Sequence, residues 1–311
     1  MTQMISGRHM KRLTLLVLAL LALVASASAQ NFKFTSIDFP GANLTTARGI
    51  NKYGDIVGSY HIPGSFRQAM LLKKGRFIPL ASPTPDATFS EATSINDLGD
   101  VTGQWADGDG FFHGFLLSDG VLTILDVPGA TDTFALGVNN SGLVVGYWDV
   151  LDANGNYLEN LGFTWKDGAF IDTHINFPGA AGALPGAGLF GVNSRGDLSG
   201  VWLPDLNGSI EHGFVCPKSA PCFSYDAPVH GTFFTDGKGI NGLGQIVGIY
   251  LTADRPNVWH SYLMSGATFT KIDFPGSTGT GAFGINVADQ IVGKYFTKDG
   301  LTHGFLAQPV Q

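Results

Sequence analysis

The sequence predicts an all-β fold: a six-bladed β-propeller of four-stranded antiparallel blades, with the ring closed by the N-terminal strand. The main observation is a pattern that occurs six times: an apolar residue and Asn, six further residues, Gly, one more residue and then an aromatic residue. The six asparagines are Asn51, Asn96, Asn139, Asn193, Asn241 and Asn286. They lie 45, 43, 54, 48 and 45 residues apart, and such a period is typical of repeat architectures. With 43 Gly and only 14% charged residues, the composition also favours a turn-rich β protein.

The first 29 residues read as a signal peptide. Three basic residues precede an apolar run over 13–25, and Ala27-Ser28-Ala29 supplies a small-x-small cleavage pattern. The run is too short to span a bilayer, which needs about 20 apolar residues. The expected organisation is therefore a signal peptide over 1–29 and one propeller domain over 30–311. The mature protein is expected to be extracellular or periplasmic, with no membrane insertion.

Charge and cysteine content support export. The leader holds three of the 18 basic residues and none of the 25 acidic ones, so the mature chain carries 15 − 25 = −10. An acidic surface releases few phosphate counterions, which argues against nucleic acid as a partner. Cys216 and Cys222 are the only cysteines, and in an oxidising compartment we expect a disulfide between them, a two-cysteine metal site being the alternative.

Each repeat divides into four short strands. In the second copy we expect strands at 92–96, 101–105, 113–117 and 121–127, separated by turn sequences such as Asp119-Gly120. Asp-Gly and Asn-Gly between apolar runs predict tight hairpins because both central residues need positive φ.

The two ends of the chain complement each other. Ile37-Asp38-Phe39-Pro40-Gly41 is the fourth-strand sequence of a repeat that lacks its first three strands, and the chain ends after residues 303–306 with three strands that lack a fourth. Joining the two completes a sixth unit, as a closed ring requires. An open solenoid is the alternative, but it would need capping repeats.

These sequences resemble a known family. His303-Gly304-Phe305-Leu306, the Ile-Asp-Phe-Pro-Gly-Ala segment from Ile37 and the Gly-Ile-Asn-x-x-Gly-x-Ile-Val-Gly segment from Gly49 are similar to the HAF family of probable extracellular repeats, whose signature is His-Ala-Phe. The resemblance covers essentially the whole mature chain. It implies an exported repeat protein without an assigned activity, so it transfers no catalytic residue.

Residues that recur are interpreted first as structural. The asparagines begin Asn-x-x-Gly turns, in which their side chains accept backbone hydrogen bonds. The aromatic residues are expected to pack between blades, with a sugar-stacking platform as the alternative. Histidines recur at the start of the third strand, and a structural hydrogen bond is favoured there over a metal. They are His113, His212, His260 and His303.

Connections of unequal length indicate where a ligand binds. The extra residues fall in the second-to-third and fourth-to-first connections, which share one face of a meander, and binding residues concentrate in such loops. The candidate segments are 149–160, 180–190, 203–211, 229–237 and 251–259. The candidate ligand-binding residues are Arg48, Asp149, Glu159, His230, Asp236, Lys238, Arg255 and Trp259.

Two of these loops alternate oxygen-bearing side chains in a way that suits calcium. The candidate ligands are Asp152, Asn154 and Asn156, followed by Glu159, and Asp205, Asn207 and Glu211. Plain hairpin turns are the alternative, because the full calcium loop is absent.

Two function classes remain. One is an exported non-catalytic binding module for a glycan or protein, acting through the variable-loop face. The alternative is a secreted lyase or hydrolase with its site at the mouth of the central channel, near Arg48, His230, Asp236 and Lys238. Signatures of zinc proteases, α/β-hydrolases and P-loop enzymes are missing, so no catalytic residue is assigned.

Overall fold

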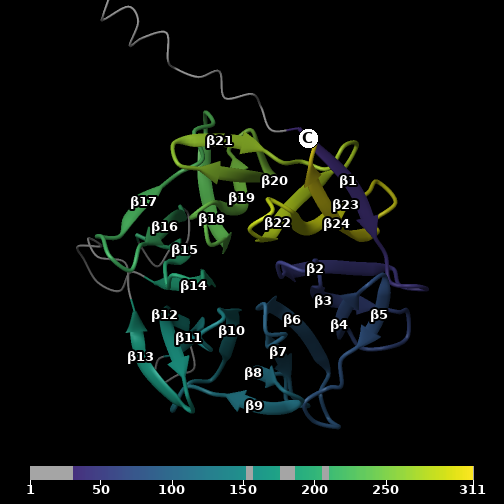
Figure 1. The fold of residues 1–311 in the computed structure, drawn as a ribbon, viewed down its shortest axis with the longest axis vertical. Coiled ribbons are helices and arrows are strands. Elements are labelled where there is room, and N and C mark those ends of the chain that lie inside the picture. Colours follow the sequence, from purple (N-terminus) through teal and green to yellow (C-terminus); the bar gives the residue numbers. More distant parts are fainter. Residues whose placement is uncertain (1–30, 152–156, 176–185, 205–209, 311) are drawn as a thin grey trace, which may run out of the picture. The chain divides into compact units, whose positions relative to one another are not determined.

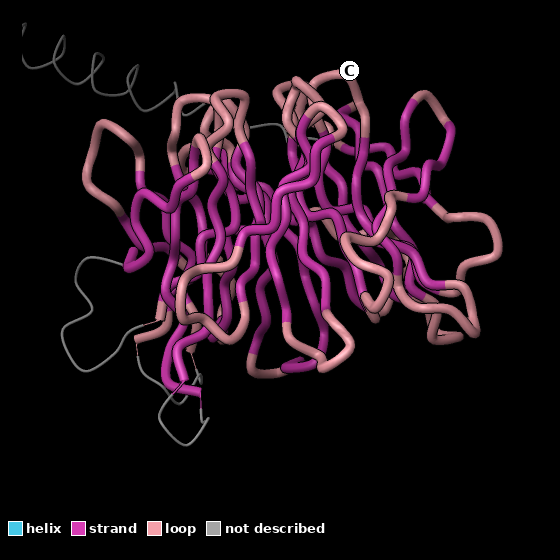
Figure 2. Tube along the Cα trace, turned by 90° about the horizontal axis from the view of Figure 1, so that it is seen from below, coloured by secondary structure: helices cyan, strands magenta, loops and turns pink. Residues whose placement is uncertain are grey.

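The computed structural model describes residues 31–151, 157–175, 186–204 and 210–310, which fold as an all-β propeller (Figure 1). Its strands form sheets arranged around a common centre, with the first strand of each repeat innermost. The connecting loops lie at two opposite ends of the strands (Figure 2). No helix in the described part of the chain is long and apolar enough to cross a membrane.

Four of the sheets are separate four-stranded antiparallel meanders. The first contains β6 (Phe89–Ile95), β7 (Val101–Ala106), β8 (Phe112–Ser118) and β9 (Val121–Leu125). The second contains β10 (Thr133–Val138), β11 (Val144–Leu151), β12 (Tyr157–Lys166) and β13 (Ala169–Ile175). The third contains β14 (Ala187–Val192), β15 (Leu198–Trp202), β16 (His212–Cys216) and β17 (Phe223–Tyr225). The fourth contains β18 (Thr232–Ile240), β19 (Ile246–Thr252), β20 (Arg255–Ser265) and β21 (Thr268–Lys271).

The remaining strands form one eight-stranded sheet, which corrects the expectation of six separate sheets. One half contains β2 (Leu44–Ile50), β3 (Ile56–His61), β4 (Gln68–Lys73) and β5 (Arg76–Pro79). The other contains β22 (Gly279–Ile285), β23 (Ile291–Phe296), β24 (Thr302–Pro309) and β1 (Phe32–Ile37). A single parallel pairing between Leu44 and Thr302 joins the halves, because the short connection after β1 brings β2 beside β24.

The N-terminal strand pairs with the C-terminal one. β1 runs antiparallel to β24, from Phe32 opposite Pro309 to Ile37 opposite Gly304. The ring of Phe34 lies 5.5 Å from that of Phe274, between centroids. The two ends of the chain therefore share one sheet and one apolar cluster.

The asparagine turns form the predicted structure and add a link that was not predicted. In the first turn, Asn51 Oδ1 accepts hydrogen bonds from the backbone N–H groups of Tyr53 and Asp55, both at 3.0 Å. In every turn the side-chain Nδ2 also donates to the backbone carbonyl of the asparagine in the next repeat. These bonds run from Asn51 to Asn96, Asn139, Asn193, Asn241 and Asn286, and from Asn286 back to Asn51, at 3.0–3.3 Å.

The repeated glycine of the second strand is explained by close approach to the first strand. A Cβ on Gly58 would lie 1.8 Å from the carbonyl oxygen of Thr46, and one on Gly248 would lie 1.7 Å from that of Asp236. Such distances exclude any side chain, so glycine is needed where the two strands cross closely.

Histidines and cysteines have structural roles. Each of the four recurring histidines pairs through Nδ1 with the aspartate that follows the fourth strand. The pairs are His113–Asp126, His212–Asp226, His260–Asp273 and His303–Asp38, at 2.7–3.0 Å. Cys216 and Cys222 form the predicted disulfide, which fits an oxidising compartment.

Candidate functional site

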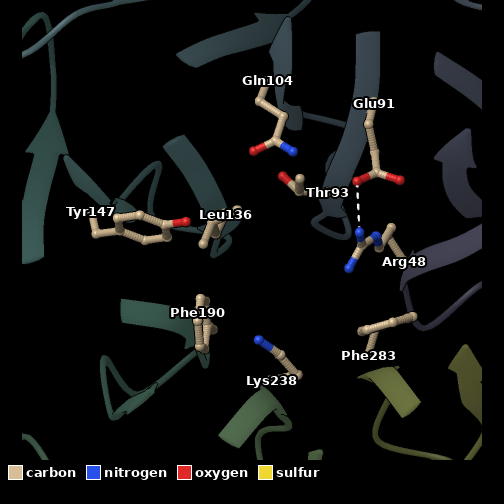
Figure 3. Close-up of a pocket in the computed structure, with 9 residues that line it drawn as sticks. All are labelled: Arg48, Glu91, Thr93, Gln104, Leu136, Tyr147, Phe190, Lys238 and Phe283. Carbon is tan, nitrogen blue, oxygen red and sulfur yellow. Dashed lines mark ion pairs between the residues drawn. The ribbon is translucent and has the colours of Figure 1, made fainter. Parts of the chain in front are cut away.

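A β-bulge in the first strand of each repeat shapes the centre of the molecule. In each case the register skips one residue, three positions before the asparagine, and a bulge of this kind re-aims the side chain of the extra residue. The six bulged residues are Arg48, Thr93, Leu136, Phe190, Lys238 and Phe283. All six line one cavity of about 220 Å³, here called the central cavity, together with Glu91, Gln104 and Tyr147 (Figure 3).

One side of the central cavity is a buried ion network around Glu91. The Glu91 side chain is 1% exposed; its carboxylate lies 2.8 Å from Arg48 Nη2, contacts Arg67 and accepts a hydrogen bond of 2.7 Å from Ser59. Burial alone would raise the pKa of Glu91, but the two guanidinium groups lower it to about 2. Glu91 is therefore ionised and holds Arg48 at the cavity wall.

The second cation of the cavity is Lys238. Its Nζ lies 2.6 Å from Asp236 Oδ2 and 3.6 Å from the centroid of the Phe190 ring. Asp236 is buried, and its Oδ1 has no hydrogen-bond partner among the described residues. Burial and the nearby charge of Asp236 raise the pKa of Glu211 to about 7.

Lys294 lies beside the Glu91 network, with its Nζ 4.6 Å from the Trp259 ring centroid. Burial and then the charge of Arg48 lower the pKa of this lysine to about 7. The unfolded chain holds the proton of this amine more tightly than the folded chain does. Burial of Lys294 therefore lowers the free energy of unfolding wherever the amine of the unfolded chain is protonated.

Replacing Lys294 with Met is expected to remove a pH dependence of stability. Between pH 7 and 10.5 the unfolded chain binds a proton that the folded chain does not, so the free energy of unfolding rises with pH by up to about 1.4 kcal/mol per unit. Urea unfolding between pH 7 and 9 should show this rise in the native protein and lose it in Lys294→Met. The exposed Lys33→Met variant is the matched control and should keep the rise; an unchanged slope in Lys294→Met would contradict the assignment.

A second, larger hollow of about 690 Å³ lies against the fourth separate sheet, beside the connection that leads into it from β17, and is here called the peripheral hollow. The 229–231 connection forms one wall and the β19–β20 hairpin forms the other, and the backbone N–H of Ala253 donates to the carbonyl of Gly231 at 2.8 Å. Its polar lining consists of His230, Tyr250, Thr252, Asp254, Arg255, His260 and Lys271. Tyr250 is buried and stacks on His260, with 5.2 Å between centroids.

The structure separates the residues that the sequence grouped at the channel mouth. Arg48 and Lys238 line the central cavity and Asp236 lies beside Lys238, but His230 lines the peripheral hollow with Arg255. The group of four is thus divided between the two cavities. His230 lies in the connection before β18, whereas Asp236 and Lys238 lie within that strand.

The variable segments are also largely strand rather than loop. Residues 149–151, 157–160, 232–237 and 255–259 belong to β11, β12, β18 and β20. The extra residues lengthen hairpins, in which pairing continues to Leu151 opposite Tyr157 and to Thr252 opposite Arg255. Asp149 is held by Asn160, and burial raises its pKa to about 6. Trp259 packs on Lys294 and Phe296.

Most of the residues that were predicted to bind calcium lie outside the described part of the chain. Asp152, Asn154, Asn156, Asp205 and Asn207, and the side chain of Glu159, lie outside the described residues. Glu211 is described and lies near Asp236. Calcium binding stays a prediction, which a calcium titration of the melting temperature would test.

Sequence reasoning missed most of the central cavity. Glu91, Thr93, Gln104, Leu136, Tyr147, Phe190 and Phe283 were not singled out. A signal was present: the position three before the asparagine differs in chemistry between the six copies, whereas its neighbours are mostly Ala, Gly, Ile or Val.

Comparisons with solved structures support a β-propeller. A mutant Aleuria aurantia lectin in complex with α-methyl-L-fucoside has a TM-score of 0.51 at 10% identity, covering 88% of this chain and 93% of the lectin. A mutant of AofleA from Arthrobotrys oligospora has a TM-score of 0.50 at 10% identity, covering 91% of this chain and 88% of that one. At such low identity these likenesses show the fold alone. No protein-family model and no curated protein sequence matches the chain.

Proposed function

We propose that the chain is an exported, non-catalytic β-propeller that binds a glycan in the peripheral hollow. In this proposal the eight-stranded sheet counts as two blades joined at Leu44 and Thr302, so the propeller is six-bladed and β1 completes the last blade. The signal peptide, an extracellular or periplasmic location and membership of the HAF family belong to the same proposal.

The observation that carries the function is the volume and lining of the peripheral hollow. Its 690 Å³ falls within the range of about 300–1,000 Å³ that is typical of small-molecule sites. Side chains of His230, Asp254 and Arg255 are exposed there, and together they offer both donors and acceptors to hydroxyl groups. Two connections that vary in length between repeats form its walls, as expected of a binding surface on a rigid scaffold.

The lectin likeness adds to this proposal. The Aleuria aurantia lectin structures are complexes with α-methyl-L-fucoside and with Fucα1-6GlcNAc. Both share the propeller fold with this chain at a TM-score of 0.51. A glycan is therefore a better first candidate than a protein ligand, and fucosides are the first sugars to test.

A glycan array with a paired substitution tests the proposal. The His230→Ala/Arg255→Ala protein is expected to lose at least ten-fold in affinity for any glycan that the native protein binds, with an unchanged melting temperature, because both side chains are exposed. The control is Arg195→Ala, an exposed arginine that pairs with Asp197 on an asparagine turn at the opposite end of the strands. Undiminished binding by the double variant, or no glycan bound by the native protein, would refute the proposal.

Catalysis at the channel mouth is less well supported. Arg48 and Lys238 are both held by carboxylates, and the histidine that was grouped with them lies elsewhere. The cavity therefore resembles a binding site for charge more than a site for proton transfer.

A further inference from the structure

The central cavity is distinct from the peripheral hollow, and the glycan proposal assigns no role to the charged and aromatic side chains that line it. Along one side of it phenylalanines and cations alternate: Arg48 lies against Phe283, with 4.2 Å from its Cζ to the ring centroid, and Lys238 lies against Phe190. In Figure 3 the ends of Arg48 and Lys238 both point into the open centre, and the hydroxyl end of Tyr147 points inward from the opposite side.

The charges around the cavity leave an excess of positive charge near Arg48. Arg48 and Arg67 share the single carboxylate of Glu91, while Asp236 and Glu211 lie on the side of Lys238. The pKa of Lys294 is lowered by burial and by the charges of Arg48, Arg67 and Lys238, and only Glu91 opposes them. The Nε of Arg48 is buried without a hydrogen-bond partner in the described structure, so this guanidinium has bonding capacity left over.

The volume and the lining of the central cavity limit the kind of ligand that fits there. About 220 Å³ lies below the range of roughly 300–1,000 Å³ of drug-sized sites, which leaves room for about one ring. Phe190, Phe283 and Leu136 supply apolar contact for a flat body, and an arginine is the residue best suited to a carboxylate. Gln104 and Thr93 complete the polar edge.

We propose that the central cavity binds a small monocarboxylate built on a single ring, with its carboxylate between Arg48 and Lys238 and its ring between Phe190 and Phe283. The carboxylate balances the excess of positive charge that Glu91 alone leaves. The ring replaces water against the aromatic walls, which adds the hydrophobic contribution to binding. Glu91 stays bound to its two arginines.

Calorimetric titration of the full mature protein at pH 7 tests this site with two matched pairs of probes. Benzoate is compared with benzamide, and glucuronate with glucose, so that each pair differs in the carboxylate and the two pairs distinguish an aromatic from a sugar acid. We expect at least one carboxylate to bind and to raise the melting temperature, with its neutral partner at least ten-fold weaker.

Cavity-filling variants locate the binding. Leu136→Trp is expected to abolish carboxylate binding because the larger side chain fills the cavity while every charge is kept, and Thr93→Phe does the same from a different strand should the first variant fail to fold. The matched control is Leu243→Trp, on an exposed turn, which should bind as the native protein does.

Two results would overturn the proposal: neither carboxylate binds, or binding survives in a folded variant with a filled cavity. Glycan binding in the peripheral hollow should be unaffected by Leu136→Trp. The glycan-array test of the proposed function can therefore fail or succeed independently of carboxylate binding in the central cavity.

Discussion

Removing residues 31–39 from the mature chain is expected to lower the melting temperature by about 5–15 °C and to cause aggregation. The truncation deletes β1, and β24 then becomes an unpaired edge along the six residues that β1 covers. It also removes the Phe34 ring from its contact with Phe274, the buried Ile37, and the partner of His303. An open edge next to exposed apolar side chains favours pairing between molecules.

The comparison requires a suitable reference protein. The reference is the chain that begins at residue 30, which lacks only the predicted leader and keeps β1. Thermal unfolding and light scattering on the two proteins would give the result. If the truncated protein melts within a degree of the reference and stays monomeric, β1 contributes little, and pairing of the chain ends is not what holds the last sheet.

The asparagine turns show how far local sequence could predict the fold. The Asn-x-x-Gly pattern predicted a turn in which the side-chain oxygen accepts backbone N–H groups, and this is confirmed in Asn51. The bond from its Nδ2 to the carbonyl of Asn96 was not predicted. That contact spans 45 residues of sequence, so it depends on how neighbouring sheets are placed, which no local pattern contains.

The central cavity was harder to predict for a related reason. Arg48 and Lys238 were named as residues near the mouth of the central channel, but Phe190 and Phe283 look like ordinary strand residues in an alternating pattern. A bulge changes which residue of a strand faces inward. Its position follows from the close contact between first and second strands at glycines such as Gly58 and Gly248, and this contact was recognised only once the strands were in place.

Glu91→Gln is expected to have the largest effect of any single substitution in the molecule. The buried carboxylate of Glu91 balances Arg48 and Arg67, and removing one partner from a buried ion network typically costs about 3–5 kcal/mol. The amide cannot neutralise two guanidinium groups, so their mutual repulsion is left uncompensated. Chemical unfolding at pH 7 should show a loss of this size.

The same substitution should change the acid side of the stability profile. The pKa of Glu91 falls from 4.5 in the unfolded chain to about 2 in the folded one. Its contribution is therefore complete above pH 4.5 and is lost as the pH falls toward 2, a change of about 3 kcal/mol. The Gln variant has no such carboxylate, so its free energy of unfolding should fall less steeply over that range.

Asp126→Asn is the control for these two effects, because Asp126 is an exposed carboxylate that pairs with His113. An exposed pair of this kind contributes at most about 1 kcal/mol, so this variant should unfold close to the native protein at pH 7 and keep its acid slope. Should Glu91→Gln also match the native protein in both respects, the two arginines would have to be balanced by solvent or by other carboxylates. The excess of positive charge that draws a carboxylate into the central cavity would then be absent, because other groups would already balance Arg48 and Arg67.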